Sequence, residues 1–194
     1  MNIVDEYLLL TISAAESAID LLRSSEGEYL REHSYQKDLH CEIKAKADRI
    51  LEELIFEHLM PTGLSILSEE RGELHGSKNS PLRFIIDPLD GTMNFVRGLG
   101  MSSISIALYS ENTPLFGVLA LYPSGDIVWG GKSLGSFLNN NPINVSSICK
   151  VDNSVLCTGF PSRFDFKDID FTKDFYKIVS DFGFKRLEGK QLHQ

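Results

Sequence analysis

Two stretches near the start of the chain carry apolar residues every three or four positions. That spacing places them on one face of an α-helix, so the sequence predicts amphipathic helices over residues 3–24 and 47–59. Pro61 and Gly63 end the second helix, since proline cannot continue it and glycine suits a helix C-terminus. Residues 25–40 are polar and irregular and predict no element. The apolar residues of the two faces are Val4, Leu8, Ile12, Ala15, Ile19 and Leu22, and Ala47, Ile50, Leu51, Leu54, Ile55 and Leu59.

Downstream of Gly63 the pattern changes to short apolar runs and to alternation with a period of two, which are typical of β-strands. Turn-forming groups of Pro, Gly, Asn and Ser separate these runs, and their spacing predicts an antiparallel meander. Residues 71–83, rich in Gly, Ser, Lys and Asn, predict a loop, and residues 168–182 predict a further helix. The predicted strands cover residues 64–68, 84–86, 103–109, 115–122, 126–129 and 155–158, with a hairpin over 135–144.

This order of elements indicates the fold class. Two helices followed by a strand-rich region predict an α+β protein in which the helix pair packs on a largely antiparallel sheet. The chain has 194 residues, of which 42% are hydrophobic. That is enough apolar material for one sizeable core.

One short stretch carries most of the information about chemistry: residues 84–95, Phe-Ile-Ile-Asp-Pro-Leu-Asp-Gly-Thr-Met-Asn-Phe. Its apolar start delivers Asp87 to the end of a strand, and Gly91 permits a tight bend. Asp87 and Asp90 can therefore point at one spot, where two carboxylates repel each other unless a cation lies between them. Oxygen ligands without His or Cys suit Mg²⁺ or Mn²⁺. The N–H groups of Gly91 and Thr92 and the Thr92 hydroxyl can then hold a phosphate.

The same motif also has a plainer interpretation, because Asp, Pro and Gly in this order are common in surface turns. Considered alone, the motif favours that interpretation. Two features of its context favour a site instead. A strand of Phe and Ile runs directly into the turn, and the acidic pair Glu69-Glu70 lies upstream.

Residues 87–95 resemble the signature of the inositol monophosphatase family, Asp-Pro-[Ile/Leu]-Asp-Gly-Thr-x-Asn-Phe. Other segments resemble the family in order and spacing, so the resemblance extends from the first helix to about residue 186. These segments are the strand and Glu pair of 66–70, the residues Lys37 and Asp48, and the stretches 135–139 and 158–161.

The resemblance implies a layered α/β sandwich of the inositol monophosphatase and fructose-bisphosphatase type, with the metal site where the first sheet meets a second, smaller one. Family members continue with a further segment that contains a Trp-Asp pair, whose Asp binds metal. Residues 188–194 of this chain do not resemble that segment and have no apolar periodicity. We therefore expect a family domain over residues 1–187, an atypical tail over 188–194, a C-terminal truncation and an incomplete C-terminal sheet.

The resemblance also implies roles in a metal-dependent hydrolysis. Glu69, Asp87, Asp90 and the backbone carbonyl of Leu89 would hold two or more Mg²⁺ ions, with Mn²⁺ as the alternative. Glu69, Asp90 and Thr92 would be the catalytic residues. Thr92 would hydrogen-bond the attacking water, with Glu69 accepting in turn.

Further roles follow from the same resemblance. One set of residues would bind the substrate, and another would support the metal ligands from behind. An acid in the first turn of a helix, such as Asp48, is also favoured by the helix dipole alone. The substrate set is Asp90, Gly91 and Thr92, and the supporting set is Lys37, Asp48 and Glu70.

The function implied is a Mg²⁺-dependent phosphomonoesterase that hydrolyses a small polyol phosphate, above all myo-inositol monophosphate to inositol and phosphate. Related phosphatases for histidinol phosphate, fructose 1,6-bisphosphate or nucleoside 3′,5′-bisphosphates are alternatives. The tail also leaves open a catalytically weak or inactive family remnant, or a domain that needs a partner to supply its missing part. A homodimer is a further expectation.

Charge and cysteine content limit the partners and the compartment. The formal net charge of −8 argues against non-specific nucleic-acid binding. Three cysteines without metal-type spacing argue against a disulfide framework and for a reducing cytoplasm. The sequence shows neither a stretch long and apolar enough to cross a bilayer nor the positive start of a secretion signal, so we expect a cytoplasmic protein that does not bind membranes.

Overall fold

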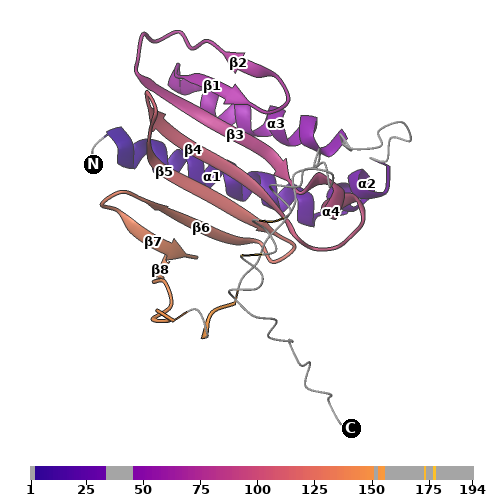
Figure 1. Cartoon of the computed structure of the whole chain (residues 1–194). Coiled ribbons are helices and arrows are strands. Elements are labelled where there is room, and N and C mark those ends of the chain that lie inside the picture. Colours follow the sequence, from indigo (N-terminus) through magenta and orange to yellow (C-terminus); the bar gives the residue numbers. More distant parts are fainter. Residues whose placement is uncertain (1–2, 34–45, 151–152, 156–172, 174–176, 178–194) are drawn as a thin grey trace. The chain divides into compact units, whose positions relative to one another are not determined.

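The computed structural model describes residues 3–33, 46–150, 153–155, 173 and 177. The chain divides into two compact units, Met1–Asn144 and Val145–Gln194. The first unit contains every helix and strand whose bounds are given below (Figure 1). Of the helix predicted for residues 168–182, the structure describes only Lys173 and Lys177, both helical. The strand predicted for 155–158 and the tail of 188–194 lie almost wholly outside the described residues.

The two predicted N-terminal helices are confirmed as α1 (Ile3–Arg23) and α3 (Lys46–Leu59). A short 3-10 turn, η1 (Met60–Thr62), follows α3 and ends at Gly63, whose φ of 72° is left-handed. Glycine adopts that conformation without the steric cost that other residues meet. α1 and α3 pack against each other and lie on the same side of the sheet (Figure 1).

The prediction of irregular structure after residue 24 is wrong, because α2 (Ser25–His33) begins there. The Ser24 hydroxyl accepts hydrogen bonds from the backbone N–H groups of Glu26 (3.2 Å) and Gly27 (3.3 Å), which caps the new helix. Gly27 allows α2 to approach α1 closely, since a Cβ there would lie 2.2 Å from the Leu22 carbonyl oxygen. α2 buries Leu30 and otherwise carries a polar sequence, so no apolar period marks it.

The strands form one mixed sheet in the order β2-β1-β3-β4-β5-β6-β7-β8. β1 and β3 are parallel and every other neighbouring pair is antiparallel, which confirms the predicted meander. A short strand inside residues 71–83 corrects the prediction of a loop, since it pairs with β1. The strands are β1 (Ser65–Ser68), β2 (Gly72–Leu74), β3 (Leu82–Asp90), β4 (Ser102–Ser110), β5 (Thr113–Tyr122), β6 (Asp126–Gly131), β7 (Gly135–Leu138) and β8 (Asn141–Pro142).

The core lies between the helices and one face of this sheet. Along β4, Ile104, Ile106 and Leu108 are completely buried and alternate with less buried residues. α1 contacts β4 and β5, and α3 contacts β3, so the helices cover the face that these side chains share. The layered α+β class is confirmed.

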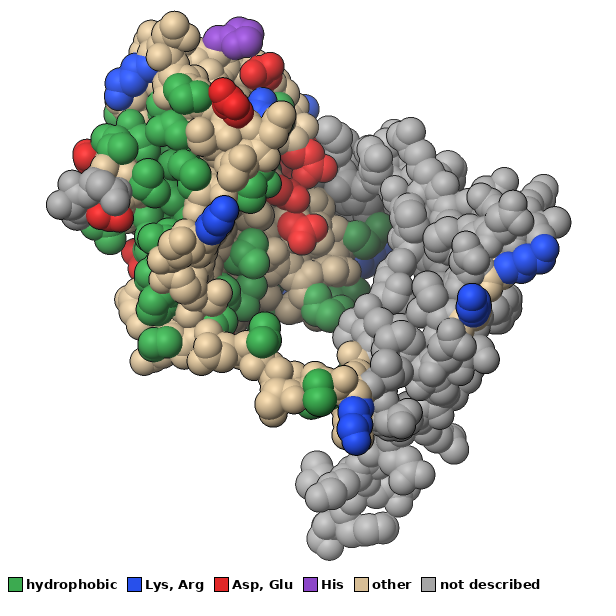
Figure 2. All heavy atoms as spheres, turned by 60° about the vertical axis from the view of Figure 1, so that its left-hand side comes forward, with side chains coloured by type: hydrophobic (Ala, Val, Ile, Leu, Met, Phe, Trp, Pro, Cys, Tyr) green, Lys and Arg blue, Asp and Glu red, His purple; other side chains and the backbone are tan. Residues whose placement is uncertain are grey.

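The other face of the sheet is less covered by the described residues of the first unit. This face carries the strand residues that alternate with the buried ones, among them Ile85, Ala107 and the 38% exposed Leu119. Figure 2 shows hydrophobic side chains over much of the side of the unit that it presents, with acidic side chains gathered beside them. Among the described residues, no helix combines the length and apolarity needed to cross a bilayer.

Candidate metal and phosphate site

The acidic motif lies at the C-terminal end of β3 and not in a free turn. Asp87 pairs with Ser105 of β4, and Asp90 pairs with Ser103, with a shift of register between the two pairs. The strand therefore continues past Pro88, which corrects the predicted turn, since an irregular pairing tolerates a proline that cannot donate a hydrogen bond. The chain bends one residue later, at Gly91.

Gly91 joins β3 to the short helix α4 (Thr92–Val96), and its φ of 77° is left-handed. A Cβ at this position would lie 2.7 Å from the Met101 carbonyl oxygen. The Ser102 hydroxyl donates to the Gly91 carbonyl oxygen at 3.0 Å, and the Asn94 amide donates to the Met101 carbonyl oxygen at 2.8 Å. These bonds hold the bend firmly against the start of β4.

Glu69 comes beside this strand end because β1 runs parallel to β3. Ser68, the last residue of β1, pairs with Ile86, and the backbone N–H of Glu69 donates to the Ile86 carbonyl oxygen at 3.3 Å. Neighbouring parallel strands end at the same edge of a sheet. The carboxyl groups of Glu69 and Asp87 are accordingly close enough for a hydrogen bond between them.

The pKa of Asp87 is raised from its ordinary value of 3.8 to about 7. Burial is the largest cause, followed by repulsion from Glu69, a hydrogen bond with Glu69 and repulsion from Asp90; the Leu89 N–H acts in the opposite direction. That N–H donates to Asp87 Oδ1 at 3.2 Å. Three acidic side chains therefore interact at one place, and no basic side chain among the described residues contributes to the pKa of Asp87.

The Thr92 hydroxyl has two direct partners, Asp48 Oδ1 and the Leu89 carbonyl oxygen, each at 3.0 Å. Asp48 lies in the first turn of α3 and is only 4% exposed. From the sequence we expected Asp48 to support the metal ligands, with no partner named for it. We expected Thr92 to hydrogen-bond the attacking water, with Glu69 accepting in turn. The structure gives Asp48 a partner, because the Thr92 hydroxyl contacts it directly.

Glu70 and Lys37 are the other residues that we expected to support the metal ligands. Glu70 lies in the turn after Glu69 and is partly buried. Lys37 lies outside the described residues. The sequence missed Glu52 of α3, which is completely buried and accepts a hydrogen bond from the Ser68 hydroxyl, next to Glu69. Its spacing of four residues from Asp48, on the same helix face, was the available signal.

The donor chemistry of the site fits a divalent cation. Carboxylate and carbonyl oxygens suit Mg²⁺ or Mn²⁺, and the mutual repulsion at Asp87 is what a cation would relieve. The Leu89 carbonyl oxygen already accepts from Thr92, yet a carbonyl has two lone pairs and can also bind a cation. In the described part of the chain, however, no group of three or more His, Cys, Asp or Glu side chains is arranged to hold a metal ion. The ligand types are therefore present, while a complete three-residue cage is not formed.

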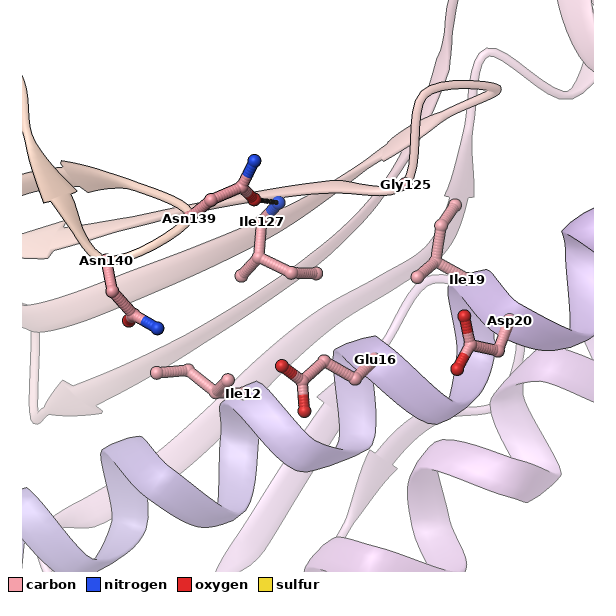
Figure 3. A pocket seen from close by; sticks show the side chains of 8 residues that line it. All are labelled: Ile12, Glu16, Ile19, Asp20, Gly125, Ile127, Asn139 and Asn140. Atoms are coloured by element: carbon pink, nitrogen blue, oxygen red, sulfur yellow. Dashed lines mark hydrogen bonds between the residues drawn. The ribbon is translucent and has the colours of Figure 1, made fainter.

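A separate cavity of about 340 Å³ lies between α1 and the β6–β7 region and shares no residue with this site (Figure 3). Glu16 and Asp20 extend from successive turns of α1, and the Asn140 amide points toward the helix, whereas the Asn139 amide is turned toward Ile127 (Figure 3). Asn139 Oδ1 accepts a hydrogen bond from the Ile127 backbone N–H at 2.9 Å. The amide thereby ties the β7–β8 turn to β6.

Paired helices on a mixed sheet, with carboxylates gathered where two parallel strands end, define the class of this protein. The chain belongs to the inositol monophosphatase family, whose family model matches residues 4–187. Members of this family are metal-dependent phosphatases that act on phosphorylated polyols.

Individual relatives agree with this assignment. The inositol-1-monophosphatase of Synechocystis sp. is 36% identical over 133 residues, which cover 69% of this chain and 45% of that protein. Inositol monophosphatase 3 of Solanum lycopersicum is 32% identical over 174 residues, covering 87% and 63%. The solved structure of extragenic suppressor protein suhB from Bartonella henselae is similar with a TM-score of 0.68 at 29% identity, covering 76% of this chain and 57% of that one. The chain thus spans 45 to 63% of the length of these two curated relatives.

Proposed function

We propose that this protein is a Mg²⁺-dependent phosphomonoesterase for a small polyol phosphate, with myo-inositol monophosphate as the first substrate to test. The observation that carries the proposal is the contact between the carboxyl groups of Glu69 and Asp87. Asp90 is close enough to Asp87 to repel it. Family membership supports the reaction class. The related esters histidinol phosphate, fructose 1,6-bisphosphate and nucleoside 3′,5′-bisphosphates belong in the same substrate panel.

The carboxylates of Glu69, Asp87 and Asp90 and the Leu89 carbonyl would hold the ions in this proposal, at least two of them, with Mn²⁺ as the substitute. Bound divalent cations neutralise phosphoryl oxygens, lower the pKa of a bound water and stabilise the leaving oxygen. Leu89 would contribute only a backbone atom, so its side chain serves packing; it is 1% exposed.

Thr92 and Asp48 would orient the attacking water. The single Thr92 hydroxyl proton is shared between the Asp48 carboxylate and the Leu89 carbonyl oxygen, each 3.0 Å away, which leaves lone pairs of Thr92 Oγ1 free to accept a hydrogen bond from a water. Buried Asp48 restrains this hydroxyl, because a buried carboxylate keeps its hydrogen-bond donors. Glu69 would accept the other proton of the same water, so two residues from different strands fix its direction of attack.

The bend after β3 would bind the phosphate. The N–H groups of Gly91 and Thr92 lie at the N-terminal end of α4, where Gly91 adopts the left-handed conformation that turns the chain from β3 into the helix. Asp90 would lie toward the leaving-group oxygen and accept hydrogen bonds from polyol hydroxyls. These residues would therefore bind the phosphate and the alcohol from adjacent positions in the chain.

The test is phosphate release from inositol 1-phosphate with Mg²⁺, with Mn²⁺ and with a chelator. We expect metal-dependent turnover that Asp90→Asn lowers by more than about 100-fold, since even residues outside the ligand shell change metal sites 10- to 100-fold. Asp20→Asn is the matched control, because Asp20 is an exposed acid on α1. A folded protein that releases no phosphate from any ester of the panel would refute the proposal.

A further inference from the structure

The completely buried carboxylate of Glu52 has contacts on both sides of the Glu69 turn. Its Oε1 accepts a hydrogen bond from the Ser68 hydroxyl. Its Oε2 lies 2.7 Å from Arg71 Nε, an ion pair that does not have hydrogen-bond geometry. A buried carboxylate is expensive unless it is paired or hydrogen-bonded, so these contacts must offset the cost of placing a charge inside the protein.

The two contacts lie immediately before and shortly after Glu69. Ser68 is the last residue of β1 and pairs with Gly72 of β2, which directly follows Arg71. Glu69 itself has an exposed side chain, and its backbone N–H makes a long bond of 3.3 Å to Ile86. Its carboxyl group interacts with that of Asp87, and the direction of this group also depends on how the residues on either side of Glu69 are held.

Arg71 is held by one face of α3 and is not a free cation. Its guanidinium lies 2.8 Å from Glu53 Oε1 as well as beside Glu52, and 5.2 Å above the centre of the Phe56 ring. Two carboxylates already offset its single charge, and the ring contact fixes its plane. Arg71 therefore serves to anchor the turn and not to bind the phosphate.

The same helix also holds the other half of the site. Asp48 lies one helical turn before Glu52 and accepts the Thr92 hydroxyl. α3 is thus tied through Asp48 to the residues that follow β3, and through Glu52 to the residues that follow β1. One rigid element sets the distance between the two stretches that carry the acidic groups.

We propose that Glu52 is a positioning residue, which directs the Glu69 carboxylate toward Asp87 by tying Ser68 and Arg71 to the helix that also holds Thr92. This role rests on the proposed function, since it assigns Glu69 to metal binding. A residue that only stabilises the fold would change the melting temperature and leave the affinity for Mg²⁺ unaltered. The two roles therefore predict different measurements.

The experiment titrates the protein with Mg²⁺ alone by calorimetry, in the absence of substrate, for the wild type, Glu52→Gln and Glu57→Gln. The Gln variant keeps the size of Glu52 and an acceptor for Ser68, and removes the charge that holds Arg71. Glu57→Gln is the matched control, since Glu57 is exposed on the same helix. We expect Glu52→Gln to raise the Kd for Mg²⁺ about tenfold, and the control to stay within about twofold of the wild type.

A double-mutant cycle shows whether Glu52 acts through Glu69. In the Glu69→Gln background, Glu52→Gln should leave the remaining Mg²⁺ affinity unchanged, because the group that it orients has been removed. Equal effects of Glu52→Gln in both backgrounds, or an unchanged Kd with a lowered melting temperature, would overturn the positioning role. If Glu52→Gln fails to fold, Ser68→Ala must raise the Kd in its place. Failure of the wild type to bind Mg²⁺ would instead refute the proposed function, and the positioning role with it.

Discussion

Asp87 gives a quantitative test of the electrostatics of the site. Its pKa is raised from 3.8 to about 7 by burial and by the neighbouring acids. The folded protein therefore binds this proton more tightly than the unfolded chain does. Between about pH 4 and pH 7 the free energy of unfolding must fall as the pH rises, because the folded state has to give up a proton that it holds well.

The size of this effect follows from the same two values. The increase in the pKa of Asp87 lowers the free energy of unfolding above pH 7 by at most about 4 kcal/mol, at about 1.4 kcal/mol per pKa unit. Asp87 is partly exposed, so solvent screening reduces the expected penalty to about 1–2 kcal/mol. Asp87→Asn removes the charge and keeps an oxygen that can accept from the Leu89 N–H. In the presence of a chelator we therefore expect this variant to be about 1–2 kcal/mol more stable than the wild type at pH 8, and to lose that advantage at pH 4.

The assay is urea unfolding of both proteins at several pH values between 4 and 8, with Asp20→Asn as the control for a general loss of charge. Mg²⁺ should reverse the order at pH 8, since a ligand that binds only the folded state stabilises the wild type by about 2.7 kcal/mol at one hundred times its Kd. A stability difference between Asp87→Asn and the wild type that is the same at pH 4 and pH 8 would refute this reasoning.

Two further changes test the geometry around the motif. Gly91→Ala places a Cβ 2.7 Å from the Met101 carbonyl oxygen at a φ of 77°, so it should lower the free energy of unfolding by about 1–3 kcal/mol in urea titrations. A loss below about 0.3 kcal/mol would show that the bend is not held as described. Thr92→Ser keeps the hydroxyl that donates to Asp48 and should retain kcat within a few-fold, whereas Thr92→Ala should lower kcat by about 100-fold or more. Equal kcat values for the two variants would remove Thr92 from the reaction.

Periodicity predicts those elements that present one continuous apolar face. α1, α3 and the β4–β6 meander meet this condition, and all are confirmed. α2 buries Leu30 within an otherwise polar sequence, so apolar periodicity does not predict it. The helix begins after Ser24, whose hydroxyl caps it. Pro88 favoured a turn, but the irregular pairing at the end of β3 accommodates a proline within the strand.

The residues of the candidate site also differ in how far the sequence predicts their arrangement. Glu69 and Asp87 each follow an apolar run, and the parallel pairing of β1 with β3 places both at one edge of the sheet. The apolar runs are visible in the sequence, whereas the parallel pairing that brings the two acids together is a feature of the tertiary structure. Asp48 and Thr92 are 44 positions apart, and no local pattern relates them. Glu52 carries a charge on a helix face that packs inward, a position where apolar periodicity alone would not place an acid.

The order of residues along the chain specifies which donor types the motif offers and where glycine permits the bend, because both depend on the residue types and their local conformational preferences. Burial and long-range pairing supply the rest. The raised pKa of Asp87, the partner of the Thr92 hydroxyl and the anchoring of Arg71 depend on distances between groups from different elements, and those distances exist only once α3 has packed against the sheet.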